Sequence, residues 1–357
     1  MRSSGSDPGK LGQGKRRMTV MEHFAGLDVS LETTTICVMD DQGGVAFEGS
    51  VATDADAIAA ALAPHAPGCV GLEAGPMSEW LHTGLARHGL DAVLMETRQV
   101  RAALRASQVK TDRRDARGIA QLLRMGWFRP VHVKTACARE RRVLLGARDT
   151  LVRRTRDLDN SVRGLLRGFG LRPPRLLRER WSDTVRQLIA AHPMLMAAID
   201  PILAARDRLA AELARLDKLV CDQARDDAIC RRLMTVPGVG AIVALSYVVA
   251  VDDPARFAKS RAVGPALGLT PSRYQSGATD RPGAITKAGD ARARVALFEA
   301  AHVMMTRVIR WFPLKAWAMR VAARRGAKRA KVALARRLAV ILHRMWVDGT
   351  DFQAQPA

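Results

Sequence analysis

Between residues 25 and 96, the hydrophobic positions of the chain alternate between short strand-like runs and helical stretches. The strand-like runs are AGLDVS, TTICVMD, GVAFEGSV, CVGLEA and DAVLME, and a helical period begins near Asp54 and again near Ser78. This alternation is typical of an α/β sheet domain. Because three strand-like runs precede the alternation, we predict a mixed sheet that starts with an antiparallel meander. A helical period returns in DRRDARGIAQLLRM, after Lys110.

From residue 138 to 228 the strand signal disappears and leucine recurs every seven residues. The first repeat consists of Leu144, Leu151, Leu158 and Leu165, and the second of Ile202, Leu209 and Leu216. Such spacing predicts a coiled-coil seam on two helices separated by the break at LRPPR. The two helices could fold back on each other or pair between subunits. The seam is imperfect, because Arg148, Arg154 and Arg206 lie near its core positions.

The sequence changes again at about residue 229, where VPGVG precedes an apolar helix and a long basic helical stretch follows. We therefore predict four regions. They are a flexible basic tail (1–20), an α/β domain (21–137), a coiled-coil helical segment (138–228) and a mainly α C-terminal domain (229–357).

The excess of basic residues indicates that the protein binds a polyanion. The chain has 47 Arg and 10 Lys against 35 acidic residues, for a net charge of +22. Residues 98–186 hold 24 basic and eight acidic residues, and residues 300–347 hold twelve basic residues and no acidic one. The arginine fork fits phosphate bidentately, so this clustering favours nucleic acid as the partner and disfavours an ordinary small-molecule enzyme.

Two further observations bear on cellular location and redox chemistry. No run reaches the roughly 18 apolar residues of a membrane span, and the N-terminus lacks the apolar core of a secretory signal. The five cysteines are scattered and form no CxxC pair, so we expect neither a disulfide framework nor a zinc site. We expect a bacterial protein of the cytoplasm, associated with the nucleoid and not with a membrane.

Four carboxylates stand out by their positions. Asp28 lies inside an apolar strand, Glu73 closes another, and Asp112 and Asp115 share one face at the start of a helix. Each alone could be structural: a partner for arginine, a strand-end carboxylate or a helix-cap residue, a role open to Thr111 as well. Together they form the oxygen-ligand set that suits Mg²⁺, and two such ions can clamp a phosphodiester for phosphoryl transfer.

These motifs resemble the RuvC-like, RNase H-fold domain of DEDD-type insertion-sequence transposases of the IS110 family. The resemblance runs from about Met21 to Trp346 and includes, in order, GLDVS, a strand-end glutamate, D-x-x-D, VPGVG, an S-G pair and ITKAG. In that family an α/β nuclease-like domain precedes a coiled coil and a C-terminal transposase domain. The resemblance implies that Asp28, Glu73, Asp112 and Asp115 bind two Mg²⁺ ions.

The resemblance also gives a role to Ser276, which by position alone would be a turn residue. Members of the family use the matching serine as the nucleophile that joins covalently to the cut DNA strand. A serine hydroxyl needs activation, and its leaving group needs charge stabilisation. The family further implies that the serine can come from another subunit and that the active unit is a homo-oligomer, either a dimer or a tetramer.

Basic residues and glycines near these motifs are candidates for nucleic-acid contact. Gly238 and Gly240 of VPGVG would let backbone amides approach a phosphate, as in a helix-hairpin-helix module. The basic candidates flank the carboxylates and the serine, and each alone could equally belong to a solvated face. They are Lys110, Arg113, Arg114, Arg273, Lys287, Arg292 and Arg294.

The resemblance implies a Mg²⁺-dependent transposase and recombinase that acts on double-stranded DNA through a phosphoserine intermediate, guided by an element-encoded RNA. Two alternatives stay open on the residues alone. One is a junction nuclease that cleaves with activated water, in which Ser276 is a structural turn. The other is a non-catalytic architectural DNA-binding protein, which would leave the strand-embedded Asp28 without a purpose.

Overall fold

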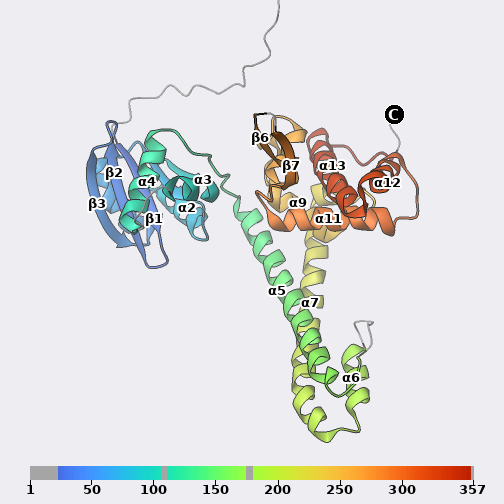
Figure 1. The fold of residues 1–357 in the computed structure, drawn as a ribbon. Coiled ribbons are helices and arrows are strands. Elements are labelled where there is room, and N and C mark those ends of the chain that lie inside the picture. The colour runs from blue at the N-terminus through green and yellow to red at the C-terminus, as the bar shows by residue number, and fades with distance from the viewer. Residues whose placement is uncertain (1–22, 106–110, 174–179, 278, 355–357) are drawn as a thin grey trace, which may run out of the picture. The chain divides into compact units, whose positions relative to one another are not determined.

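The chain divides into two compact units, Met1–Lys134 and Thr135–Ala357, in a computed structural model that describes residues 23–105, 111–173, 180–277 and 279–354 (Figure 1). The predicted basic tail (1–20) and Lys110 lie outside the described residues. No described helix combines the length and the apolar character needed to cross a membrane.

A five-stranded sheet forms the centre of the first unit. Its strands, in the order β3-β2-β1-β4-β5, are β1 (His23–Val29), β2 (Thr33–Asp40), β3 (Val45–Ala52), β4 (Cys69–Glu73) and β5 (Ala92–Met95). Strands β1, β2 and β3 are antiparallel neighbours, whereas β1, β4 and β5 run parallel. The prediction of a mixed sheet that starts with an antiparallel meander is therefore confirmed.

Helices cover both faces of this sheet because its central strands carry apolar residues at consecutive positions, and successive side chains point to opposite faces. The helices are α1 (Ala55–Leu62), α2 (Ser78–Arg87), α3 (Thr97–Leu104) and α4 (Asp112–Arg124), with a short 3-10 turn at Ala63–His65. Leu27 of β1 packs in one cluster with Ile58 of α1 and Leu81 of α2. Phe24 of the same strand packs on the opposite face with Val100 of α3 and Ile119 of α4.

The second unit is mainly helical. Its helices are α5 (Ala136–Arg167), α6 (Trp181–Ile189), α7 (Pro193–Asp226), α8 (Ala228–Leu233), α9 (Ala241–Val251), α10 (Val263–Ala266), α11 (Ala291–Thr306), α12 (Pro313–Arg325) and α13 (Ala327–Asp348), with 3-10 turns at Pro254–Arg256 and Ser260–Ala262. A two-stranded antiparallel hairpin, β6 (Pro271–Ser276) and β7 (Thr279–Ile285), is inserted before α11. The apolar core gathers residues of α9, α11 and α13.

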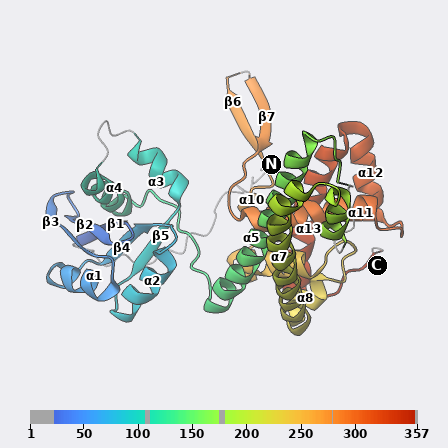
Figure 2. The same cartoon turned by 90° about the horizontal axis from the view of Figure 1, so that it is seen from below.

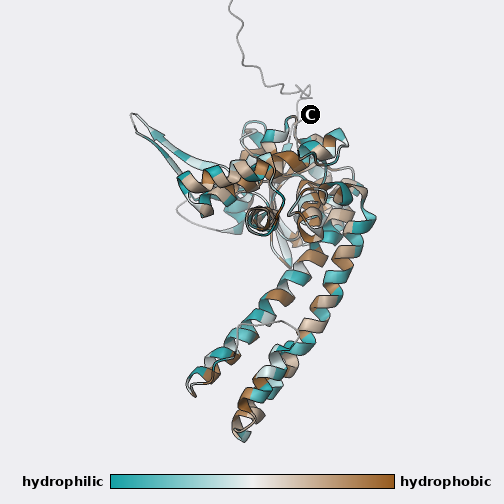
Figure 3. Ribbon diagram, turned by 90° about the vertical axis from the view of Figure 1, so that its right-hand side faces the viewer, coloured by the Kyte–Doolittle hydropathy of each residue, from teal (hydrophilic) through white to brown (hydrophobic). Residues whose placement is uncertain are grey.

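The long helices α5 and α7 lie side by side, and polar and apolar positions are mixed along them (Figure 3). Their buried contacts differ from the predicted leucine seam: Val162 and Leu166 are buried, whereas the predicted core residue Leu165 is 54% exposed. A straight α-helix drifts by about 20° per heptad against a strict seven-residue repeat. An early leucine of the repeat therefore faces the neighbouring helix while the last one points to solvent.

Two arginines at the predicted seam join α5 to α7 through ion pairs. Arg148 of α5 contacts Asp217 of α7 at 2.5 Å, and the buried Arg206 of α7 contacts Asp159 of α5 at 3.1 Å. A buried charge needs a partner, so these ion pairs explain how Arg148 and Arg206 fit near the core positions of the predicted seam.

Candidate functional site

Asp28 and Glu73 lie at the C-terminal ends of two neighbouring parallel strands, on the same face of the sheet. Gly26 of β1 pairs with Gly71 of β4 and Leu27 with Leu72, so Asp28 and Glu73 come next in the register. Side chains two residues apart share a face, which places both carboxylates on the face that α4 covers at Gly26 and Gly71. Ligand sites in such sheets form at the carboxyl ends of the parallel strands.

Helix α4 runs opposite to β1, so it starts at the end of the sheet where the two carboxylates lie. Phe24, at the start of β1, packs with Leu122 and Leu123 near the C-terminus of α4. Further along β1, a Cβ atom on Gly26 would approach the backbone of Ala116 and Ala120 to 2.3 Å. Continuing in the same direction, the N-terminal turn of α4, with Asp112 and Asp115, lies toward the end of β1 that carries Asp28.

An open cavity of about 420 Å³ on this face supports that placement. Asp112 lines it together with Thr35 of β2 and Ser50 of β3. Thr35 is the register partner of Asp28 across the β1–β2 ladder, so Asp112 lies over the strands beside Asp28. The Thr111 hydroxyl caps α4 by accepting a hydrogen bond from the Arg114 backbone N–H at 3.3 Å, which leaves Asp112 without the capping role.

The environment of the four predicted metal ligands differs from one to the next. Asp28, Glu73 and Asp115 are half-buried, and Asp112 is exposed. The Glu73 carboxylate lies 3.5 Å from the Arg101 guanidinium of α3. Within the described ranges no three His, Cys, Asp or Glu side chains converge closely enough to hold a metal ion. The donor set consists of carboxylate oxygens, the ligand type that a divalent cation such as Mg²⁺ prefers.

A carboxylate that the sequence analysis did not single out fixes α4 to the sheet. Glu48 of β3, whose side chain is only 6% exposed, pairs with Arg113 and Arg117 of α4, and its Oε2 accepts from Arg117 Nη2 at 2.8 Å. The hydrogen bond from Arg117, reinforced by Arg113, lowers the pKa of Glu48 to about 2. Arg113, a predicted nucleic-acid ligand, therefore also has a structural partner, while Arg114 is exposed.

Ser276 lies at the exposed tip of the β6–β7 hairpin, which extends away from the helices of its unit (Figure 2). It is the last residue of β6 and pairs with Thr279, and Gly277 follows it with a φ of +54°, a conformation that glycine adopts readily. Arg273 on the same strand makes two contacts with Asp280 across the hairpin, at 2.6 and 2.8 Å. Arg273, which was predicted to contact phosphate, thus stabilises the hairpin that carries Ser276.

The other predicted basic ligands near the hairpin also take part in internal structure. Arg292 pairs with Asp149 at 2.7 Å, and Arg294 donates to the carbonyls of Leu267 and Ala288 at 2.9 and 2.7 Å. Lys287 lies between the hairpin and α11 with a φ of +55°. Arg294 therefore joins α11 to the loops before β6 and after β7, whereas Arg292 joins α11 to α5.

The VPGVG glycines have different surroundings. Gly238 has a φ of +91°, and a Cβ atom there would come within 2.8 Å of the Ala300 carbonyl of α11. Its lack of a side chain therefore lets the turn pack against α11. Gly240, at the N-cap of α9, has open space around its Cα atom. Of the two predicted glycines, only Gly240 leaves room beside the helix N-terminus for a ligand.

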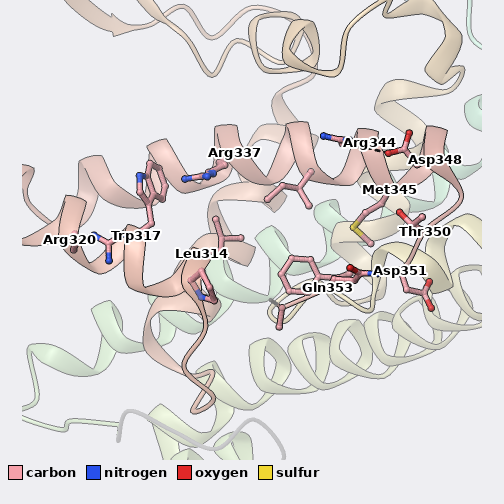
Figure 4. A pocket seen from close by; sticks show the side chains of 14 residues that line it. Leu314, Trp317, Arg320, Arg337, Arg344, Met345, Asp348, Thr350, Asp351 and Gln353 are labelled. Atoms are coloured by element: carbon pink, nitrogen blue, oxygen red, sulfur yellow. Dashed lines mark hydrogen bonds and ion pairs between the residues drawn. The ribbon is translucent and has the colours of Figure 1, made fainter. Parts of the chain in front are cut away.

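A cavity of about 850 Å³ lies between α12, α13 and the segment that follows α13 (Figure 4). The Arg337 guanidinium stacks over the Trp317 ring at 4.7 Å. Arg344 pairs with Asp348 at 3.0 Å, and Asp351 is a second carboxylate in the lining. Its cations are therefore largely engaged by an aromatic ring or by carboxylates.

The sheet order and the helices that follow it are compatible with an RNase H-like fold, and the basic, mainly helical second unit fits a protein that acts on DNA. A profile of DEDD transposases of the IS110 group matches residues 25–170, and a profile described as Transposase IS116/IS110/IS902 family matches residues 230–315. These two stretches contain the four carboxylates and Ser276.

Similar proteins agree with these matches. The transposase for insertion sequence element IS1111A of Coxiella burnetii is 28% identical over 338 residues, which cover 92% of this chain and 91% of that protein. A probable family 20 transposase of Pseudomonas aeruginosa is 30% identical over 239 residues, covering 65% and 71%. The transposase for insertion sequence element IS1328 of Yersinia enterocolitica is 25% identical over 293 residues, covering 82% and 87%.

The chain belongs to the IS110 family of DEDD transposases. It is accordingly a DNA transposase of an insertion sequence, an enzyme that binds and acts on DNA, and its family uses divalent metal ions.

Proposed function

We propose that this transposase cuts and rejoins DNA by transesterification, with Ser276 as the nucleophile and Asp28, Glu73, Asp112 and Asp115 as ligands of two Mg²⁺ ions. The observation that carries the proposal is the placement of Asp28 and Glu73 as neighbours at the ends of β1 and β4, on the face where α4 begins. Resemblance to the family supplies the role of the serine. Each unit thus contributes one part of the chemistry.

The reaction that this assignment describes conserves the phosphodiester energy. The Ser276 Oγ forms a bond to phosphorus and loses its proton, while the bond from phosphorus to one sugar oxygen breaks and that oxygen gains a proton. A sugar hydroxyl of another strand then attacks the phosphoserine and restores the serine. Divalent ions, when bound, supply charge stabilisation at the attacking and leaving oxygens.

The residues of this chain position the reacting groups in distinct ways. The exposed hairpin presents the Ser276 hydroxyl at its tip, and the Arg273–Asp280 pair holds the two strands of the hairpin together. In the first unit, Glu48 holds α4 over the sheet through Arg113 and Arg117. This keeps the α4 carboxylates at the end of the sheet where Asp28 lies.

We further propose that the enzyme works as a homo-oligomer, a dimer or a tetramer, guided by a structured RNA from its own element. The net charge of +22 suits binding to nucleic-acid backbones, and the sequence contains no recognised base-reading motif. Both observations support a mechanism in which the RNA recognises the DNA sequence by base pairing. Sequencing the nucleic acid that co-purifies with the protein tests this. A discrete RNA transcribed beside the gene is expected, and a mixture of unrelated RNA and DNA would contradict it.

Two variants test the chemistry on a plasmid that carries the gene with its flanking DNA, together with the co-purified RNA. Ser276→Ala is expected to abolish both strand cleavage and the covalent protein–DNA adduct while DNA binding stays intact. Asp28→Asn is expected to abolish cleavage as well, with unchanged thermal unfolding. If Ser276→Ala still cuts DNA, water is the nucleophile and the serine is a turn residue. If Asp28→Asn retains every activity, the carboxylates have no catalytic role.

A further inference from the structure

A groove with a cavity volume of about 1130 Å³ lies at the foot of the hairpin that carries Ser276. One wall is formed by Pro271 of β6 and by Pro282–Ile285 of β7, and the other by the turn between α12 and α13 and the first half of α13. Figure 1 shows the hairpin and α13 as neighbours in the second unit. The groove is thus built from segments about 50 residues apart in the chain.

The groove is lined by four cations and, among the described residues, by no carboxylate. The cations are Arg325 at the end of α12 and Lys328, Arg329 and Arg336 of α13. Within the described part of the chain none of them takes part in an ion pair, unlike Arg113, Arg273 and Arg292. Four like charges around one groove repel each other, and an anionic ligand would offset that cost.

The position of two of these cations argues against a purely structural role. Lys328 and Arg329 lie in the first turn of α13, which contains no acidic residue. The N-terminus of a helix carries partial positive charge, so cations there destabilise the helix and carboxylates stabilise it. Arg325 is different, because the last turn of α12 is a favourable place for a cation. Lys328 and Arg329 are therefore retained at a cost to helix stability.

The shape and lining of the groove suit a sugar–phosphate backbone. On α13, Arg329, Val332 and Arg336 share one face because they are three and four residues apart. Val332 thus adds apolar surface between two cations, and Ile285 of β7 adds apolar surface on the opposite wall. Alternating cationic and apolar surface matches the alternating phosphates and sugars of a nucleic-acid strand. The cavity between α12 and the segment after α13 is less suitable, because Asp348 and Asp351 would repel phosphate (Figure 4).

We propose that this groove binds the backbone of the DNA that Ser276 attacks, and that it holds that DNA along the hairpin. The choice of DNA over RNA rests on the proposed role of Ser276. From Pro271 to Ser276, β6 spans about 17 Å at roughly 3.4 Å per residue. Since a DNA strand carries one phosphate for every 3.4 Å of helix axis, the groove engages phosphates about five nucleotides from the one that Ser276 attacks.

The test is the salt dependence of DNA binding by the full-length double variant Lys328→Gln/Arg329→Gln. A labelled DNA duplex of mixed sequence and an RNA of the same sequence serve as probes, in EDTA buffer so that no strand is cut. The slope of log K against log salt should become less steep on DNA by about 1.8, because each lost phosphate contact removes about 0.9. Thermal unfolding should stay unchanged or rise slightly, since two unfavourable cations leave the helix N-terminus.

A variant with the same loss of charge elsewhere is the matched control. Arg208 and Arg215 of α7 are 78% and 77% exposed, and both already contact Glu212. Arg208→Gln/Arg215→Gln should leave the slope on DNA unchanged. An unchanged slope in the groove variant, or an equal change in both variants, would overturn the proposal. A change on RNA that equals or exceeds that on DNA would overturn the assignment to DNA.

DNA binding in EDTA does not require Ser276 to react. The groove proposal and the proposal that Ser276 is the nucleophile can therefore fail separately. If Ser276→Ala abolishes the adduct while the groove variant binds DNA normally, the groove proposal alone is wrong. If the groove variant loses phosphate contacts on DNA and Ser276→Ala still cleaves, the nucleophile proposal alone is wrong.

Discussion

Replacement of Gly26 by alanine is the sharpest test of how the sheet positions the α4 carboxylates. A Cβ atom at residue 26 would lie 2.3 Å from the Ala116 carbonyl oxygen and 2.3 Å from the Ala120 backbone nitrogen. Both neighbours are backbone atoms of α4, which cannot turn aside as a side-chain end can. To reach an ordinary contact distance, α4 must move away from β1 by about 1 Å, and Asp112 and Asp115 move with it.

This displacement has two measurable consequences. Overpacking of this kind costs about 1–3 kcal/mol of unfolding free energy. A misplacement of about 1 Å in a catalytic arrangement can cost about 10²-fold in rate. We therefore expect Gly26→Ala to reduce metal-dependent cleavage far more than the remaining folded fraction explains.

The neighbouring strand provides a matched control. Gly71 pairs with Gly26 in the register, and a Cβ atom there would meet the flexible end of Met95 at 2.6 Å. Gly71→Ala should therefore cost less, in both stability and cleavage. Chemical unfolding and cleavage of the same DNA substrate are measured for both variants. Equal effects of the two substitutions, or full cleavage by Gly26→Ala, would refute the close packing of α4 on β1 as the feature that positions Asp112 and Asp115.

Two further predictions concern stability. The pKa of Glu48 is about 2 instead of the usual 4.5, so its ion pairs stabilise the fold fully above about pH 4.5 and are lost as the pH falls through 2. Glu48→Gln should lower the free energy of unfolding at neutral pH by about 1 kcal/mol, given its exposed arginine partners. The free energy of unfolding of this variant should also depend less on pH in the acid range, and an identical pH profile would contradict the pairing. The buried Tyr247 donates a hydrogen bond to the Ala339 carbonyl at 2.7 Å, so Tyr247→Phe should cost about 1 kcal/mol in urea unfolding, while Tyr274→Phe, at a residue 70% exposed, should cost nothing measurable.

Local pattern was sufficient to predict most elements of the first unit. Short apolar, strand-like runs predicted the strands around Asp28 and Glu73, and a helical period predicted the helix that begins at Asp112. These signals arise from the backbone itself, because a strand repeats every two residues and a helix every 3.6. Helix α3 was not predicted, since its eight residues are short for a periodic signal and include only one buried side chain, Val100.

The heptad prediction shows how local pattern can mislead. The leucines do recur every seven residues, but the residues of α5 that are buried include Leu145, Val162 and Leu166, which do not follow that repeat. Their burial depends on which neighbours α5 meets along its length. Near its start α5 packs into the helical core of the second unit, and near its end it packs with α6 and α7. A constant seven-residue repeat cannot describe a helix whose neighbours change.

The sequence by itself determined the kinds of element, the overall cationic character and the residues that match the transposase motifs. Only the tertiary structure decided that α4 runs opposite to β1, that Glu48 fixes this helix through Arg113 and Arg117, and that residues near 271–285 and 325–336 enclose one cationic groove. The reason is physical. Periodicity reflects bonds between nearby residues, whereas these arrangements depend on packing and charge pairing between segments about 50 or more residues apart, which no local pattern encodes.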